Sequence, residues 1–94
     1  MLLLYDDIMK TKLITKISDL KPDTFILCMD SKNQFVEYVI SVNTSGFYKS
    51  KIIGRITDDD KIVRNNQHPI ISRWLFNDYT IFELNKCDVI ARLI

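Results

Sequence analysis

The stretch that decides the fold reads Phe-Tyr-Lys-Ser-Lys-Ile-Ile-Gly-Arg-Ile-Thr and covers residues 47–57. Its alternation of apolar with polar or basic positions is typical of a half-buried strand, with Tyr48, Ile52 and Ile56 on the core side. Gly54 stands inside this strand, where a glycine often marks a bulge or a sharp bend. We therefore expect one long strand, bent at Gly54, as the element around which a small sheet curls.

Shorter strand-like segments lie on both sides of this stretch. Residues 35–42 alternate most clearly, with Val36, Tyr38 and Ile40 on one side and Phe35 and Glu37 on the other. Clusters of Asp, Asn, Ser and Gly separate the segments, as turns do between consecutive strands. The sequence predicts further strands over 10–17, 24–29, 61–64, 79–84 and 88–94, with the last two forming a hairpin.

The segment 69–76 fits two structures. Pro69 suits the first position of a helix, and Ile70, Ile71, Trp74 and Leu75 fall on one helical side. The same residues could form a buried strand, but we predict one to two helical turns. The expected fold is mainly β: a small antiparallel meander of five to seven strands, curled into an SH3-like or OB-like barrel or a strongly bent sheet, with at most one short helix at about 69–76.

Length and composition agree with a single β-rich domain over residues 1–94. The chain is 47% hydrophobic with a net charge of +1, which excludes a disordered tail. It contains 14 isoleucines and a single alanine, Ala91, and isoleucine favours strands whereas alanine favours helices. Many Ile, Lys and Asn residues also indicate AT-rich coding, as in a phage, a mobile element or a low-GC bacterium. Residues 1–9 are either a first strand or an extension, since Met9 itself resembles a start.

The cysteines and the first residues predict a cytoplasmic protein. Cys28 and Cys87 stand far apart in apolar surroundings, as buried thiols in a reducing compartment do. The apolar opening at 1–5 meets acidic residues at once, so it lacks the features of a signal peptide. No segment has the length of apolar sequence that a membrane span needs.

No catalytic, cofactor or metal motif is present in the sequence. The three carboxylates at 58–60 lack the further oxygen ligands of a calcium loop and indicate a solvated turn. His68 is the only histidine, and neither cysteine lies in a visibly basic setting that would activate it for a Cys–His enzyme. The two glycines exclude a glycine-rich phosphate loop. We expect no enzyme, no cofactor and no metal.

Two candidate binding surfaces follow from the strand pattern. The first is a basic and aromatic side of the long strand, continued on the next strand, and such interleaving can stack bases and hold phosphates. The low net charge supplies little long-range attraction for nucleic acid. The plain alternative is a solvated side of the sheet. The residues of this predicted surface are Phe47, Lys49, Lys51, Arg55, Lys61 and Arg64.

The second surface gathers Arg73, Trp74, Phe76 and Tyr79. Trp, Tyr and Arg are enriched at the energetic centres of protein interfaces. The plain alternative is that the large rings complete a thin core, as a chain this small requires.

The leading functional hypothesis is a small non-enzymatic binding or accessory protein, such as a phage or mobile-element inhibitor, that docks on a macromolecular partner, in the first place a protein. One alternative is a nucleic-acid-binding β-barrel that uses the basic and aromatic strand. Another is a small-molecule binder of the nucleotide type at a dimer interface. Homo-oligomerisation through an edge strand at 88–94 is also expected, because an apolar edge invites pairing. No membrane association is expected.

Overall fold

The computed structural model describes residues 10–59, 61–65, 67, 69–74 and 79–93. It is mainly β, as predicted, with seven antiparallel strands and one short C-terminal helix. The elements are β1 (Lys10–Leu13), a 3-10 turn η1 (Ile17–Asp19), β2 (Phe25–Met29), β3 (Gln34–Val42), β4 (Phe47–Ile56), β5 (Ile62–Arg64), β6 (Ile70–Trp74), β7 (Thr80–Leu84) and α2 (Lys86–Arg92).

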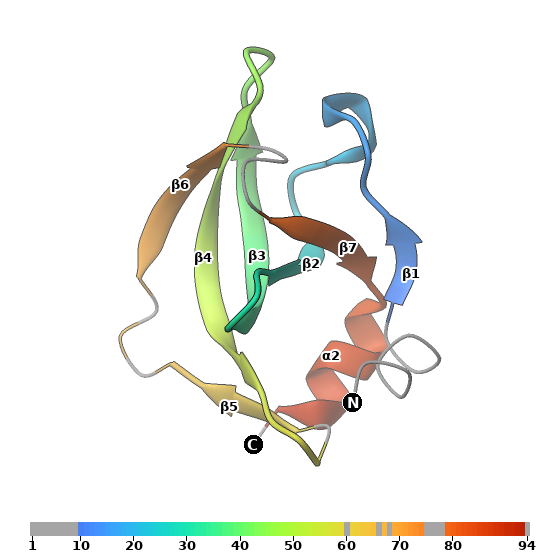
Figure 1. Cartoon of the computed structure of the whole chain (residues 1–94), viewed down its shortest axis with the longest axis vertical. Helices are drawn as coiled ribbons and strands as arrows, with labels where there is room; N and C mark the ends of the chain where they lie inside the picture. Colours follow the sequence, from blue (N-terminus) through green and yellow to red (C-terminus); the bar gives the residue numbers. More distant parts are fainter. Residues whose placement is uncertain (1–9, 60, 66, 68, 75–78, 94) are drawn as a thin grey trace.

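The predicted long strand is the organising element of the sheet. The strand order is β1-β7-β2-β3-β4-β5, and β6 also pairs with β4 (Figure 1). β3 therefore lies along one edge of β4, while β6 and β5 divide its other edge. Residues 47–51 pair with β6, and residues 54–56 pair with β5. One strand thus pairs with three neighbours. The course of β4 therefore determines where the side chains of β3, β5 and β6 lie relative to one another.

The bend predicted near Gly54 is present as a bulge. Val36 pairs with Gly54 and Glu37 pairs with Ile52, so Ile53 has no partner of its own on β3. Gly54 is required at this place because a Cβ atom there would lie 2.3 Å from the carbonyl oxygen of Val63. The absence of a side chain lets β5 approach β4 at the bulge.

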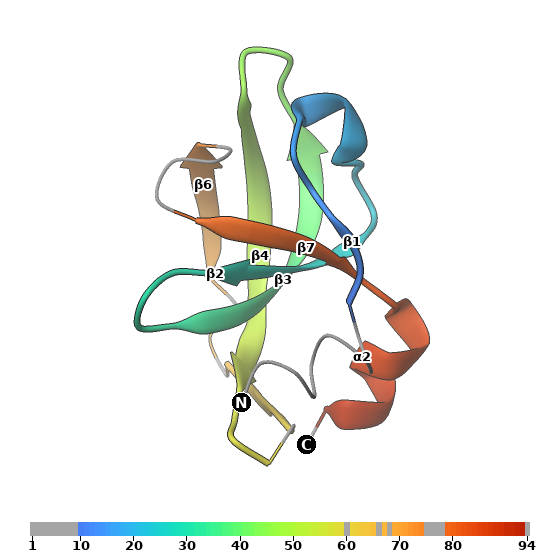
Figure 2. The same cartoon turned by 45° about the vertical axis from the view of Figure 1, so that its right-hand side comes forward.

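Two small cores lie on opposite sides of the curled sheet. The first packs the sheet against α2 through Leu27, Val36 and Leu84 from the strands and Val89 from the helix. The second contains Ile26, Val39, Tyr48 and Ile81, together with Ile14 and Leu20 around η1. Figure 2 shows β2 and β7 running across the direction of β4, which lets one twisted sheet cover both cores.

Two predicted elements are wrong. Ile70–Trp74 is strand β6 rather than a helix at 69–76, because its side chains alternate between the inner and outer side of the sheet; Phe76 lies outside the described residues. The segment 88–94 was predicted as a strand but belongs largely to helix α2, whose start is capped by the Asn85 side chain accepting from the backbone N–H groups of Cys87 and Asp88.

These corrections change the predicted topology. The described sheet is not closed into a barrel, and the consecutive hairpins of a meander extend only from β2 to β5. No hairpin joins 79–84 to 88–94, because β7 pairs with β1 and β2 instead. The predicted edge strand for oligomerisation is also absent, since a helix at 86–92 satisfies its own backbone groups.

The first strand ends at Leu13 rather than at residue 17, and residues 1–9 lie outside the described part. Among the residues that the structure describes, no helix has the length and apolar character to cross a membrane.

Candidate functional site

The bulge divides the first predicted surface between the two sides of the sheet. Residues that pair directly across antiparallel strands project their side chains to the same side. Lys51 pairs with Tyr38, whereas Arg55 pairs with Phe35, and residues 35 and 38 of β3 project to opposite sides. Arg55 therefore lies on the side opposite to Lys51. The sequence-based prediction placed Lys51 and Arg55 together because it assumed a regular strand.

The two residues predicted on the adjoining strand are also separated. Lys61 precedes β5 and belongs to the turn in which the backbone N–H of Thr57 donates to the carbonyl of Lys61 at 2.9 Å. Arg64 ends β5 opposite Gly54, beside the bulge. Neither residue pairs with the part of β4 that carries Lys49 and Lys51.

An aromatic–basic face forms instead where β4 pairs with β6. Phe47 pairs with Trp74, Lys49 with Ser72 and Lys51 with Ile70, so all six side chains project to one side. The rings of Phe47 and Trp74 meet edge to face with centroids 5.2 Å apart. Phe47, Lys49 and Lys51 of the first predicted surface and Trp74 of the second therefore meet in one place. We define the aromatic–basic face as Phe47, Lys49, Lys51, Ile70, Ser72 and Trp74.

This face is both apolar and positively charged. Ile70 is 65% exposed and Trp74 is 57% exposed, and they lie at the two ends of β6 on the same side of the sheet. None of its six residues carries a carboxylate. The neighbouring Tyr38 on β3 donates its hydroxyl to Asp23, so the carboxylate at the border of the face already has a partner.

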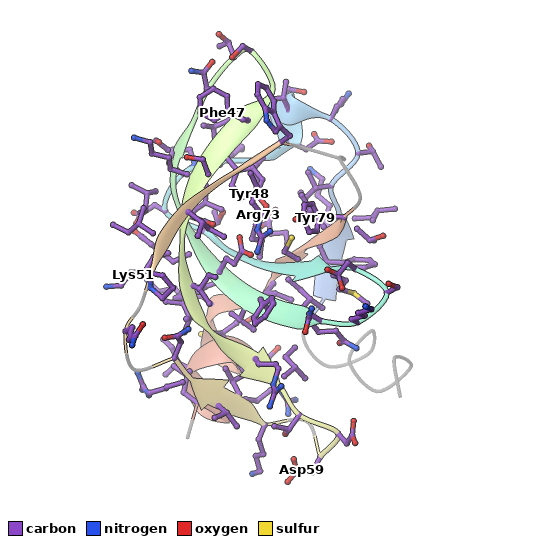
Figure 3. All side chains as sticks on the ribbon, turned by 60° about the vertical axis from the view of Figure 1, so that its left-hand side comes forward. Phe47, Tyr48, Lys51, Asp59, Arg73 and Tyr79 are labelled. Atoms are coloured by element: carbon purple, nitrogen blue, oxygen red, sulfur yellow. The ribbon has the colours of Figure 1, made fainter. Side chains whose placement is uncertain are left out.

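The other side of β6 carries a buried ion pair. Arg73 donates from Nε to Oε2 of Glu37 at 2.8 Å, and Ser50 donates to Oε1 of the same carboxylate at 2.6 Å. The Glu37 side chain is fully buried and that of Arg73 is 14% exposed. The guanidinium carbon also lies 4.6 Å from the ring centre of Tyr79. Figure 3 shows Arg73 and Tyr79 pointing to the inner side of the curled sheet, whereas Lys51 points away from it.

This cluster fastens β6 to the sheet and is protected from solvent. Burial raises the pKa of the Glu37 carboxyl, although the bonds from Ser50 and Arg73 act in the opposite direction. Burial would lower the pKa of Arg73, but the attraction and hydrogen bond of Glu37, together with Cys28 and Tyr48, raise the pKa overall. Both groups are therefore suited to a structural ion pair.

The second predicted surface is split by this arrangement. Trp74 projects outward to the aromatic–basic face, while Arg73 and Tyr79 project inward and contact one another. Phe76 lies outside the described residues. Glu37 was not among the predicted site residues. Its position between Phe35 and Val39 on an apolar side of the strand was the available signal for a buried partner.

The cysteines do not form a reactive site in the described structure. Both are free; Cys28 is buried and Cys87 is exposed on α2. Burial raises the pKa of the Cys28 thiol to about 12, with a further contribution from Glu37, so it stays protonated at neutral pH. The Tyr48 hydroxyl donates to its sulfur at 3.9 Å. His68, the one histidine of the sequence, lies outside the described residues.

The acidic turn carries no described metal site. Thr57 donates its hydroxyl to Asp59 at 2.5 Å, Asp58 is exposed, and Asp60 is outside the described residues. Within the described ranges, no group of three or more His, Cys, Asp or Glu side chains is arranged to hold a metal ion.

Comparisons with protein-family models, with curated proteins and with solved structures found no match. What the aromatic–basic face can bind follows from its own chemistry. Exposed aromatic and aliphatic side chains beside lysines can bury apolar side chains of a partner and pair with its carboxylates.

Proposed function

We propose that the chain is a small non-enzymatic binding protein that docks an extended, acidic segment of a protein partner on the aromatic–basic face. The observation that carries the proposal is the pairing of β4 with β6, which places exposed Trp74 and Ile70 beside Lys49 and Lys51 on a face without carboxylates. An accessory or inhibitory role of a phage or mobile-element protein agrees with this proposal and with the composition.

The apolar residues of the face supply the affinity. Fully burying a large apolar side chain contributes about 1.5–3 kcal/mol, and both Ile70 and Trp74 have most of their surface still to bury. Phe47 supports the Trp74 ring from the side. A well-packed aromatic anchor surrounded by weaker contacts is the usual energetic centre of a protein interface.

The lysines and the strand edge supply orientation. Lys49 is exposed, Lys51 is half-buried, and both are on β4 beside β6. Within the described part of the chain, β6 pairs only with β4. An extended peptide could therefore add as a further strand beside β6, with its acidic side chains directed at the lysines. Main-chain bonds would then set the register, and the lysines would select for negative charge.

Single-stranded nucleic acid is the second candidate, because aromatic rings beside lysines also stack bases and contact phosphates. Two features favour the peptide. Ile70 is the most exposed large apolar residue described and offers no ring for stacking, and the net charge of +1 provides little general attraction to phosphates.

The test is a fluorescence-anisotropy titration with a labelled peptide of repeating Val-Ser-Glu-Ser, whose valines and glutamates project to the same side of an extended strand, and, in parallel, with oligo-dT. We expect the peptide to bind, and we expect Trp74→Ala and the double variant K49E/K51E each to weaken binding at least about tenfold. The matched control K21E/K86E reverses two exposed lysines elsewhere and should leave the peptide affinity unchanged. Peptide affinity that is equal in all variants, or binding of oligo-dT alone, would overturn the proposal.

A further inference from the structure

A small hollow lies on the aromatic–basic face at Ser72. It is lined by Phe47, Ser72, Arg73 and Trp74, and its volume is about 140 Å³. A cavity of about 150 Å³ lined by apolar side chains holds a single benzene molecule. A hollow of this size therefore fits one side chain of a partner and no larger ligand.

The order of side chains along β6 creates the hollow. Ile70, Ser72 and Trp74 project to the same side of the sheet, so the small serine stands between two large apolar residues. On the neighbouring strand, Phe47 pairs with Trp74, and the two rings meet edge to face. The rings close one end of the hollow, and the short side chain of Ser72 leaves the space beside them unfilled.

The lining of the hollow is apolar although Arg73 takes part in it. The guanidinium of Arg73 is turned inward, where Nε donates to Glu37 at 2.8 Å, and only 14% of its side chain is exposed. Its charge is therefore paired on the other side of the sheet. A carboxylate placed against the two rings would lose water without gaining this cation as a partner. The hollow thus favours an apolar side chain.

Two lysines determine what can flank the side chain that enters the hollow. Lys49 pairs with Ser72 and Lys51 pairs with Ile70, so both project to the same side as the hollow. In an extended segment that adds beside β6, residues two positions apart project to one side as well. This segment and β4 would lie about 10 Å apart, a distance that a lysine and a glutamate side chain span together.

We propose that the hollow is a specificity pocket for one valine or isoleucine of the docked segment, with an acidic residue two positions before it and another two positions after it. A β-branched residue fits because it would stand in an extended strand. This inference rests on the proposed function, since it requires that a segment docks beside β6. It adds the sequence that the site would recognise: acidic, any, valine or isoleucine, any, acidic.

The experiment compares three labelled peptides by fluorescence anisotropy on the full chain. The reference is Ser-Glu-Ser-Val-Ser-Glu-Ser, and the other two carry alanine or glutamate in place of the valine. Alanine should weaken binding about tenfold, because two carbon atoms fewer are buried in the hollow. Glutamate should bind more weakly than alanine, because its carboxylate would face the rings of Phe47 and Trp74.

Ser72→Leu then fills the hollow from the side of the protein. In this variant the valine and alanine peptides should bind equally within about twofold, since the leucine takes the space that valine needs. Ser72 is exposed, and binding of the alanine peptide shows that the variant keeps its fold and its face. The matched control Ser31→Leu makes the same change in the exposed turn between β2 and β3 and should leave the preference for valine in place.

Three results would overturn the pocket while docking on the face remained: equal affinity for the valine and alanine peptides in wild type, a preference for valine that persists in Ser72→Leu, or tightest binding of the glutamate peptide. Binding of the repeating Val-Ser-Glu-Ser peptide without binding of the reference peptide would also overturn it. If neither peptide bound, the proposed function itself would fail, and this inference with it.

Discussion

The Glu37–Arg73 pair connects strands β3 and β6, which β4 separates in the sheet. Taking a carboxylate and a guanidinium out of water is costly, and the cost is offset only when each has good partners. Here the Glu37 carboxylate receives one bond from Arg73 and one from Ser50. Because Arg73 projects inward, its neighbours Ser72 and Trp74 project outward. The buried pair therefore orients the exposed side chains of β6.

Replacing Arg73 by methionine should destabilise the protein by about 3–5 kcal/mol, because Glu37 would stay buried without its cation. The loss should depend on pH. Arg73 lowers the pKa of Glu37, which burial already holds above its ordinary value of 4.5, so its removal raises that pKa further. A folded state with a raised carboxyl pKa binds more protons than the unfolded state, and its stability falls as pH rises above 4.5.

Urea unfolding of wild type and Arg73→Met at about pH 5 and about pH 7.5 checks this sign. The difference between the two proteins should be larger at the higher pH. In a Glu37→Gln background the same replacement should cost less, since no buried charge is left unpaired. A loss of stability that is equal at both pH values and in both backgrounds would show that the pair does not act through charge.

The bulge of β4 is the element that determines what each side of the sheet displays. It returns β4 to register with β3 after one extra residue, and it is the reason why Arg55 and Lys51 project to opposite sides. The same feature brings β5 against β4 at Gly54. The bulge therefore separates Arg55 from the aromatic–basic face, whose own residues pair in regular register between β4 and β6.

Gly54→Ala should destabilise the protein by about 1–3 kcal/mol, because the new methyl group would meet the backbone oxygen of Val63 at 2.3 Å and the strands would have to separate. Urea unfolding measures the loss, and amide hydrogen exchange of β5 should increase with it. Ser72→Ala, at an exposed position of the same sheet, should change stability by no more than about 0.5 kcal/mol. If Gly54→Ala changed the free energy of unfolding as little as Ser72→Ala does, β5 would not lie as close to β4 as the structure shows.

The sequence predicted the elements whose pattern is local. Strands β2, β3, β4, β5 and β7 were found within a few residues, because alternation and turn residues define them without reference to the rest of the chain. β6 was misassigned because the spacing of Ile70, Ile71 and Trp74 also fits a helix, and only pairing with β4 decides between the two. For α2 the decisive feature is the Asn85 side chain, which caps the first turn of the helix, whereas the prediction made 88–94 a strand.

At the scale of the whole molecule, the candidate sites depend on contacts that no local pattern reveals. Phe47 and Trp74 are distant in the sequence and meet only because β6 lies beside β4. Glu37 and Arg73 meet only because the sheet curls. The sequence identified Phe47, Lys49, Lys51 and Trp74 as candidates but could not join them, and it placed Arg55 with the wrong neighbours because a bulge reverses the sides of a strand.

The pairing of β4 with β6 makes the aromatic–basic face the proposed docking site, on the side of the sheet opposite to Arg55. The most direct measurement is an NMR titration of the labelled full chain with the acidic valine–glutamate peptide, read residue by residue. Amide signals of residues 47–51 and 70–74 should shift on binding, while those of Arg55 and Val63 should not. Shifts confined to Arg55, Val63 and their neighbours, or no shifts in β6, would contradict it.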